Sequence, residues 1–143
     1  MRIVYGDIWT VQADFRGITT NGTVKKNGCV VMGRGVALQA RDKYPGIDCE
    51  LGQRILNEGN HVHMLRGEVF SFPVKRDWWE PASIGLIKQS VGELTILAQW
   101  FPKAVFAIPM PGTGNGHLAP EIVWPLLQGL PNNVMIVMWS DGI

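Results

Sequence analysis

Two short glycine-rich segments have the composition of anion-binding turns. Residues 32–36 read Met-Gly-Arg-Gly-Val and open a candidate helix, and residues 112–116 read Gly-Thr-Gly-Asn-Gly. Glycine lets the backbone approach a ligand closely, and the free amides and the dipole at a helix start attract a phosphate. Neither segment is a Rossmann fingerprint or a Walker P-loop, because the third glycine and the Lys-Ser/Thr pair are missing. Two interpretations remain: a diphosphate held between the segments, or two tight turns without a ligand.

Lys75 ends a candidate strand and has the chemistry of a nucleophile. A lysine attacks a sugar carbon only as the neutral amine, so its pKa must be lowered by burial or by a nearby cation, which Arg76 is placed to supply. The alternative is a solvated charge at a strand end. His117 follows the second glycine segment and is a second candidate for catalysis, because an imidazole can exchange protons near neutral pH.

The remaining histidines and the cysteines show no pattern of a site. His61 and His63 share one face of a candidate strand, but no further ligand residues accompany them. We therefore expect structural or surface histidines, no metal site and no cofactor. Cys29 and Cys49 have neither metal-ligand nor CxxC spacing, so we predict two reduced thiols.

The composition is that of one ordinary globular domain. Apolar residues make up 46% of the 143 residues and charged residues 17%, far from the composition of a disordered chain. The net charge of +1 does not favour strong general nucleic-acid binding, so an anionic ligand must be held locally. Apolar runs are too short to span a membrane, and the N-terminus lacks a secretory pattern. We expect an intracellular, cytoplasmic monomer without membrane contact.

Hydrophobic periodicity predicts strands that alternate with helices. The helix from Pro81 to Trp100 is the clearest, because its apolar residues recur at three- and four-residue spacing. The other predicted helices are 36–44, 48–57 and 120–130, and the predicted strands are 2–9, 17–20, 61–65, 68–74, 104–109 and 134–139. This order predicts a single domain over residues 1–143, a three-layer α/β/α sandwich with a mixed, mostly parallel central sheet.

Polar or glycine-rich residues follow several of the predicted strands. In open α/β sheets, ligands bind beyond the carboxyl ends of the strands. The segments that come to this edge are 20–22, 75–77, 112–116 and 140–141. We expect one ligand site there. The neighbouring pair Trp78 and Trp79 either forms a wall over the ligand or seats the following helix on the sheet.

Several short motifs occur in a fixed order along nearly the whole chain. They are Gly6-Asp7-Ile8, Thr20-Asn21-Gly22, the helix start at 32–37, Tyr44-Pro45-Gly46, the segment SFPVKRDWWE at 71–80 and Pro111-Gly112-Thr113-Gly114. This set resembles the macro domain family, which binds ADP-ribose. Within the family it is most similar to the branch that contains the terminal ADP-ribose glycohydrolase and related phage and bacterial macro domains.

The resemblance implies a role in ligand binding for each matching position. Asp7 would accept a hydrogen bond from the adenine amino group, and the backbone of Ile8 would help to read the ring. Thr20 and Asn21 would lie near the distal ribose. The last strand would supply an adenine wall through Trp139 and Ser140, unless Trp139 belongs to the core. The glycine segments would hold the diphosphate and part of the distal ribose through Gly33, Arg34, Gly35, Val36, Gly112, Thr113, Gly114, Asn115 and Gly116.

The resemblance also implies catalytic residues. Lys75 matches the lysine with which the terminal ADP-ribose glycohydrolase attacks the distal ribose, and Asn21 would lie beside the same sugar. The acid of that enzyme's second glycine loop falls here on Asn115 or Gly116, and asparagine cannot act as a general base. Three options stay open: replacement by Asp77 or Asp141, replacement by His117, or binding without efficient turnover.

Two functions follow from the resemblance. The favoured one is an enzyme that binds ADP-ribose and hydrolyses an ADP-ribosyl linkage to a protein carboxylate or to nucleic acid, or that dephosphorylates ADP-ribose 1''-phosphate. Its partners would be ADP-ribose and ADP-ribosylated protein or nucleic acid. The alternative is a non-catalytic ADP-ribose-binding module, which the missing loop acid favours.

Overall fold

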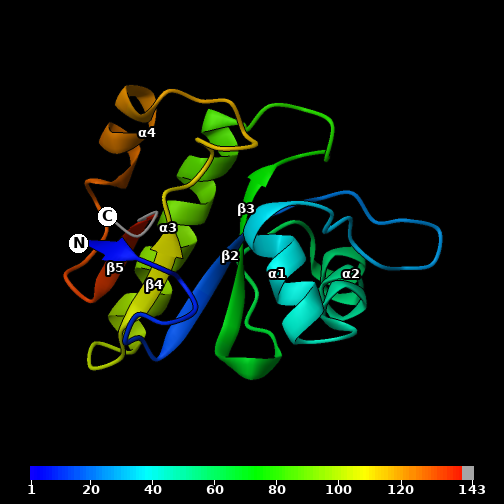
Figure 1. The fold of residues 1–143 in the computed structure, drawn as a ribbon, viewed down its shortest axis with the longest axis horizontal. Coiled ribbons are helices and arrows are strands. Elements are labelled where there is room, and N and C mark those ends of the chain that lie inside the picture. The colour runs from blue at the N-terminus through cyan, green and yellow to red at the C-terminus, as the bar shows by residue number, and fades with distance from the viewer. Residues whose placement is uncertain (140–143) are drawn as a thin grey trace.

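The computed structural model describes residues 1–139, which form strands that alternate with helices (Figure 1). The strands are β1 (Arg2–Gly6), β2 (Phe15–Asn21), β3 (Val69–Lys75), β4 (Phe106–Pro109) and β5 (Val134–Trp139). The helices are α1 (Gly35–Lys43), α2 (Ile47–Glu58), α3 (Ile84–Trp100), α4 (Pro120–Leu127) and the short 3-10 helix η1 (Arg66–Glu68). None of the helices within this range is long and apolar enough to cross a membrane.

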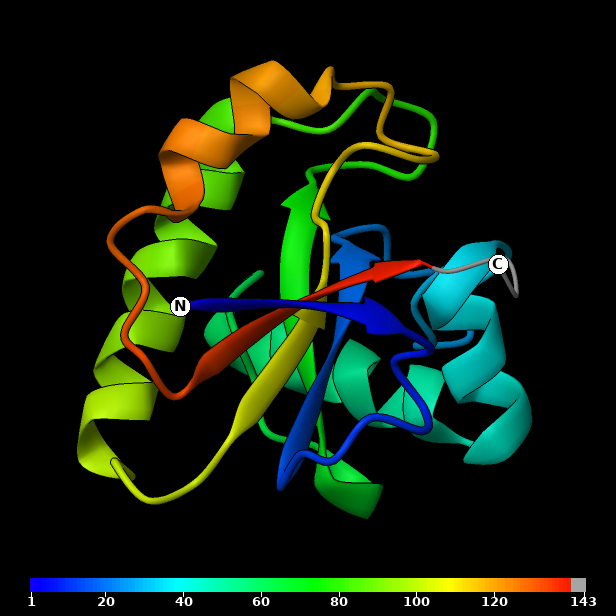
Figure 2. The same cartoon turned by 60° about the vertical axis from the view of Figure 1, so that its left-hand side comes forward.

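The five strands pair in the order β1-β5-β4-β2-β3, and every pair is parallel. Helices cover both faces of the sheet, so the predicted three-layer α/β/α sandwich is confirmed (Figure 2). The sheet of residues 1–139 is parallel throughout rather than mixed, because consecutive strands are joined by helices or a long loop and not by hairpin turns. The continuous burial of residues 69–74 in β3 is typical of a strand covered on both faces.

Separate apolar clusters hold the helices on opposite faces of the sheet (Figure 2). On one face, Leu94 of α3 lies in a buried cluster that also includes residues of α4. On the other face, Leu51 of α2 shares a buried cluster with Ile18 of β2. Val69 and Phe70 are successive residues of β3 and belong to different clusters, as the alternation of side chains along a strand requires.

The predicted strand at 61–65 is wrong, and only one isolated bridge forms there. Backbone amides of this segment bind side chains: Val62 N donates to a Glu93 carboxylate oxygen (2.9 Å), and His63 N donates to Ser71 Oγ (2.9 Å). The apolar alternation of the segment favours a strand. These side-chain acceptors take the amides that a ladder would use.

Capping determines where α3 begins. The helix starts three residues later than predicted, at Ile84, because Ser83 Oγ accepts a hydrogen bond from Leu86 N (3.2 Å) and makes Ser83 the N-cap. Just before it, Ala82 N donates to Gly116 O (2.9 Å). The segment that leads into α3 is therefore tied to the second glycine segment.

Cys29 and Cys49 form a disulfide, so the prediction of two reduced thiols is wrong. The loop after β2 folds back on α2, where Val30 N donates to Asp48 O (3.0 Å). This contact brings together two cysteines that are 20 residues apart, a separation with no recognisable motif. The pairing depends on tertiary structure, which spacing alone does not reveal.

Gly52 permits the close contact between α2 and this loop. A β-carbon at position 52 would overlap the carbonyl of Gly28, a backbone group that cannot move aside easily. We predict that Gly52→Ala destabilises the protein by about 1–3 kcal/mol, the usual cost of overpacking. The control is Gly92→Ala in α3, where no atom lies within 4 Å of the added carbon. There alanine should stabilise the helix by up to about 1 kcal/mol. Urea denaturation measures both changes, and equal stabilities would contradict this packing.

Candidate functional site

All five strands end at the same edge of the sheet because they are parallel. Figures 1 and 2 show the loops after β3 and β4 side by side at this edge, where the hydrogen bond between Ala82 and Gly116 joins them. Segments far apart in the sequence thus gather in one place. The predicted ligand site lies at this carboxyl edge.

The first glycine segment forms the N-terminus of α1. Arg34 is the N-cap residue with an extended backbone, and Gly35 begins the helix with a φ of +58°, a left-handed value that favours glycine. No side chain caps this end of α1, so the amides of its first turn are available to a ligand. A β-carbon on Gly33 would meet no atom within 4 Å. The segment therefore combines an uncapped helix start with free space beside Gly33, as an anion site requires.

The second glycine segment lies against the first. Gly112 has a φ of +77° and His117 a φ of +62°, and the turn is closed by a hydrogen bond from His117 N to Gly114 O (3.1 Å). A β-carbon on Gly35 would lie 3.4 Å from Asn115 Nδ2. The fold thus brings together the two segments that were predicted to hold a diphosphate, and a larger residue at position 35 would narrow the space between them.

Lys75 is the last residue of β3 and lies beside the loop that follows it. Its Nζ donates to Trp78 O (3.3 Å). Burial is the main cause that lowers the Lys75 pKa, and the positive charge of Arg34 lowers it further. The neighbouring cation is therefore Arg34 and not the predicted Arg76, whose guanidinium lies beside Gly85 at the start of α3. A lowered pKa increases the fraction of neutral amine, which is the nucleophilic form.

A network of side-chain hydrogen bonds joins the loop after β2 to the loop after β3. Asn21 Nδ2 donates to Val31 O (2.9 Å), and Asn21 Oδ1 accepts from Thr23 N (3.0 Å). Thr23 Oγ1 donates to Asp77 Oδ1 (3.1 Å) and accepts from Trp78 N (3.0 Å). Two candidate catalytic residues, Asn21 and Asp77, thus have structural partners. Thr23 was not predicted, because a threonine after an Asn-Gly turn gives no sign of a partner so distant in sequence.

Asp7 and Trp139 lie next to each other at the ends of β1 and β5. Trp139 pairs in register with Gly6, the residue before Asp7. It is 71% exposed, so the alternative that it belongs to the core is wrong. Asp7 Oδ1 accepts from Trp9 N (2.9 Å), which closes the turn after β1. This end of the site therefore combines a carboxylate with an exposed indole.

Two further predicted ligand residues, Ile8 and Thr20, are buried. The carbonyl of Ile8 accepts from Arg16 Nη1 (2.8 Å). Thr20 Oγ1 has no hydrogen-bond partner within residues 1–139. A buried hydroxyl without a partner costs about 1–3 kcal/mol, so a ligand that bonded to it would be stabilised. The predicted ligand residue Ser140 and the candidate acid Asp141 lie outside the described residues.

Trp78 and Trp79 are exposed by 49% and 64%. Their rings meet edge to face with centroids 6.0 Å apart. Both indoles reach solvent over about half or more of their surface, which favours the alternative that they form a wall over the ligand. They form an aromatic surface next to Lys75.

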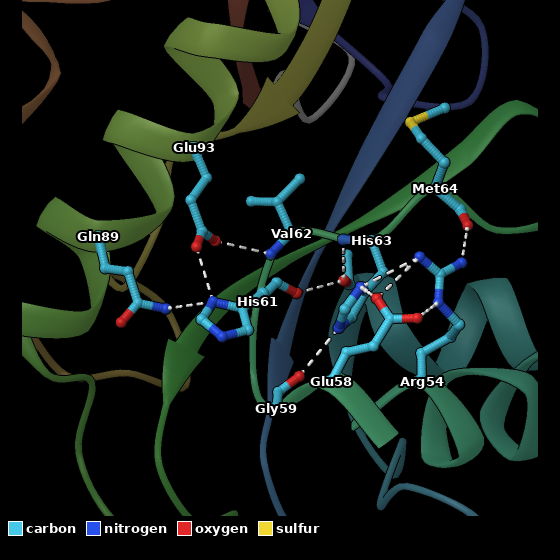
Figure 3. Close-up of polar contacts among 10 residues, drawn as sticks. Arg54, Glu58, Gly59, His61, Val62, His63, Met64, Gln89 and Glu93 are labelled. Carbon is cyan, nitrogen blue, oxygen red and sulfur yellow. Dashed lines mark hydrogen bonds and ion pairs between the residues drawn. The ribbon is translucent and has the colours of Figure 1, made fainter. Parts of the chain in front are cut away.

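His61 and His63 have structural partners in the polar cluster between α2 and α3 (Figure 3). His61 Nδ1 bonds to Glu93 Oε2 (2.6 Å). His63 Nε2 bonds to the carbonyl of Gly59 (2.9 Å), which leaves Nδ1 to accept from Arg54 Nη2 (3.3 Å). The expected structural role of both histidines is confirmed.

Asn60 connects this cluster to the candidate site. Its Nδ2 donates to the main-chain carbonyl of Lys75 (3.3 Å), while the main-chain carbonyl of Asn60 accepts from Gln89 Nε2 (3.0 Å). Asn60 therefore links the end of β3 to α3. No sequence pattern predicts this contact, because it depends on the irregular path of residues 59–63.

No protein-family model matches the chain. It is 30% identical to a DNA ADP-ribosyl glycohydrolase of Mycobacterium bovis, in an alignment that covers 98% of this chain and 43% of that protein. It is 29% identical to a DNA ADP-ribosyl glycohydrolase of Thermus aquaticus, with 76% of this chain and 33% of that protein covered. The chain thus spans less than half the length of these curated relatives.

Solved structures share the fold over nearly the whole chain. The macrodomain of Mycobacterium tuberculosis DarG has a TM-score of 0.77 at 26% identity, with 98% of each chain covered. A Thermosipho africanus DarTG structure in complex with ADP-ribose has a TM-score of 0.78 at 18% identity, with 96% of this chain and 41% of that chain covered. The chain therefore has the macrodomain fold, and its resemblance to the macro domain family is confirmed. Within that family it is similar to the macrodomains of DarG proteins.

We predict that Thr23→Val loosens the loop that follows Lys75. The substitution removes the hydroxyl that bonds to Asp77 and Trp78 and should cost about 1–2 kcal/mol of stability. Thr23→Ser is the matched control because it retains the hydroxyl. Urea denaturation measures stability, and hydrogen exchange measures the opening of the loop. The amide of Trp78 should exchange faster in Thr23→Val alone; unchanged exchange would show that the network does not hold the loop.

Proposed function

We propose that this chain binds ADP-ribose along the carboxyl edge of its sheet. The observation that carries the proposal is the approach of the two glycine segments at Gly35 and Asn115, beside a lysine whose pKa is lowered. Backbone amides in such turns suit a diphosphate. The complex of the structurally similar Thermosipho africanus DarTG with ADP-ribose supports this choice of ligand.

The ligand would extend from the Asp7 end of the site to Lys75. Asp7 uses Oδ1 to close its own turn, so its second carboxylate oxygen is the acceptor for the adenine amino group. The exposed indole of Trp139 beside it is the stacking surface for the ring. The hydroxyl of Thr20, which lacks a partner in the described part of the chain, is the group for the distal ribose.

The proposed reaction is hydrolysis of an ADP-ribosyl linkage to DNA. The names of the relatives, DNA ADP-ribosyl glycohydrolases, favour nucleic acid over a protein carboxylate or a 1''-phosphate. The neutral amine of Lys75 attacks the anomeric carbon of the distal ribose, the base leaves, and water then releases the sugar from the lysine. Burial and the charge of Arg34 both favour the neutral amine that this step needs.

The second glycine segment lacks the acid that would protonate the leaving base. We therefore assign this proton transfer to His117. Asp77 already receives the hydroxyl of Thr23 on Oδ1, whereas the side chain of His117 is exposed in the second glycine segment. An imidazole titrates near neutrality and can both donate and accept a proton there. The alternative function is a binding module without turnover, which the kinetic experiment below distinguishes.

The adenine assignment predicts that Asp7→Asn weakens ADP-ribose binding about tenfold, because the amide still closes the turn but presents a donor to the adenine amine. Calorimetric titration with ADP-ribose, and with ADP as a comparison, measures the change. Asp14→Asn is the control: Asp14 Oδ2 accepts from Val105 N (2.7 Å) at the opposite edge of the sheet, so affinity should not change. Wild-type affinity in a folded Asp7→Asn protein would remove the adenine assignment.

The covalent route predicts that Lys75→Met abolishes release of ADP-ribose from an ADP-ribosylated oligonucleotide but leaves binding of free ADP-ribose nearly intact. Parallel assays with ADP-ribosylated protein and ADP-ribose 1''-phosphate identify the preferred linkage. An active Lys75→Met protein would exclude the covalent route. A wild-type protein that binds ADP-ribose but cleaves none of the three substrates would establish the binding module instead.

The pH dependence of turnover should report the charge of Arg34. Positive charge at Arg34 lowers the pKa of Lys75, so removing it in Arg34→Gln raises that pKa. The neutral amine then forms only at higher pH, and the rising limb of kcat should move in the alkaline direction. Single-turnover rates at saturating substrate separate this effect from weaker diphosphate binding. Lys103→Gln, an exposed charge before β4, is the control. An unshifted limb in Arg34→Gln would contradict the role of Arg34.

A further inference from the structure

The Cys29–Cys49 disulfide joins the loop after β2 to the first turn of α2, and Figure 1 shows this loop running past α2. The two ends of the disulfide differ in environment, because Cys29 is only 6% exposed whereas Cys49 lies exposed on the surface. A thiolate from solution can attack a disulfide that has an exposed end, and exposed disulfides are the ones that are readily reduced. The chain has only these two cysteines, so a thiol reagent has a single target.

The chain that follows Cys29 leads directly into the first glycine segment. Two residues separate Cys29 from Met32, with which that segment begins. Val30 N donates to Asp48 O (3.0 Å) in the first turn of α2. The side chains of Val30 and Met32 are buried in one cluster with Leu51 of α2. The disulfide therefore ties the chain to α2 three residues before the proposed diphosphate segment.

The other stem of the same loop contacts the turn beside Lys75. Val31 N donates to Thr23 O (3.1 Å), which joins the two stems. The hydroxyl of Thr23 in turn bonds to Asp77 and to the amide of Trp78. The cross-linked loop thus connects the diphosphate segment with the turn next to the lysine, so a change in its position affects both sides of the candidate site.

Few other contacts hold the tip of this loop. Residues 25–27 are exposed, and the tip closes on itself through hydrogen bonds from Gly28 N to Lys25 O (2.8 Å) and from Cys29 N to Asn27 Oδ1 (3.0 Å). In the part of the chain that the structure describes, a single hydrogen bond, from Val30 to Asp48, joins residues 22–31 to α2. Without the cross-link, this bond and the apolar contacts would have to hold the loop alone.

We infer that Cys29 and Cys49 form a redox-sensitive latch. The oxidised pair holds the first glycine segment in the position that binds ligand, and reduction to two thiols weakens the binding of ADP-ribose. This inference rests on the proposed function and specifies how the same site is regulated. The two cysteines take no part in the chemistry at Lys75, because they act only by positioning the segment that would hold the diphosphate.

The latch opens by exchange with a dithiol reductant. A thiolate of the dithiol attacks Sγ of the exposed Cys49, the sulfur–sulfur bond breaks, and Cys29 leaves as a thiolate. The second thiol of the reductant then attacks its own sulfur in the mixed disulfide and releases Cys49. The dithiol loses two electrons and two protons and becomes a disulfide, and the two cysteines take up both. The reverse exchange with a small disulfide closes the latch.

Calorimetric titration with ADP-ribose compares the oxidised protein with the same protein reduced by dithiothreitol. Reduction should weaken binding about fivefold or more, the lower end of the usual coupling between two sites, and reoxidation should restore it. Mass measurement after alkylation of free thiols verifies the state of each sample. Equal affinities of the oxidised and reduced proteins would overturn the latch.

Cys49→Ser is the matched control because it removes the cross-link at an exposed position. It should bind ADP-ribose like the reduced wild type, and dithiothreitol should not change its affinity. A response of this variant to dithiothreitol would show that the reagent acts elsewhere than on the disulfide, which would also contradict the latch.

Thermodynamic linkage supplies a second measurement on the unmodified chain. A ligand that binds the oxidised protein more tightly must oppose reduction by the same factor. The ratio of dithiol to disulfide that reduces half of the protein should therefore rise by this factor at saturating ADP-ribose. An unchanged ratio would contradict the coupling between the disulfide and the site.

Hydrogen exchange separates the latch from the proposed function, because it needs no ligand. The amides of Val30 and Val31 should exchange faster in the reduced protein, since the loop that contains them is no longer cross-linked. The amide of Val105, bonded to Asp14 at the opposite edge of the sheet, is the control and should not change. If neither form binds ADP-ribose, the proposed function fails, while these rates still decide whether the disulfide restrains the glycine segment. Equal exchange in both forms would overturn the latch.

Discussion

Parallel pairing of all five strands is the constraint on which the candidate site depends. Parallel strands must all end at the same edge, so the loops after β1, β2, β3 and β4 meet there whatever their distance in the sequence. The order β1-β5-β4-β2-β3 puts the Asp7 turn at one end of this edge and Lys75 at the other. An elongated ligand lying across the strand ends matches this geometry better than a compact one would.

Backbone groups and short polar side chains, rather than strong charges, build this edge. Asn21 and Thr23 bond to neighbouring loops, which fixes the positions of the amides in between. Gly35 and Gly112 use left-handed backbone conformations that let the turns close. Such an edge would hold an anion without a basic surface, which is compatible with a chain that combines two candidate anion-binding segments with a net charge of +1.

Much of this arrangement could be predicted because it depends on local signals. Apolar periodicity predicted β5 and most of α1, α2 and α3. The glycine segments and Lys75 predicted that the site lies at the carboxyl edge of the sheet. The failures involve contacts between distant residues. Residues 61–65 have strand-like composition, but their amides bind Glu93 and Ser71. The Cys29–Cys49 disulfide and the role of Thr23 likewise depend on how loops fold over one another, which no spacing rule describes.

The cation that lowers the pKa of Lys75 is Arg34 and not the expected Arg76, and this changes how a ligand would affect that pKa. Arg34 belongs to the segment proposed to hold the diphosphate, so a bound diphosphate would offset part of its charge and, by itself, raise the lysine pKa. The same ligand removes water from the amine, which lowers that pKa, and burial is already the larger of the two causes. In the proposed complex these two effects oppose each other, and desolvation of the amine by the substrate favours the neutral form that attacks the sugar.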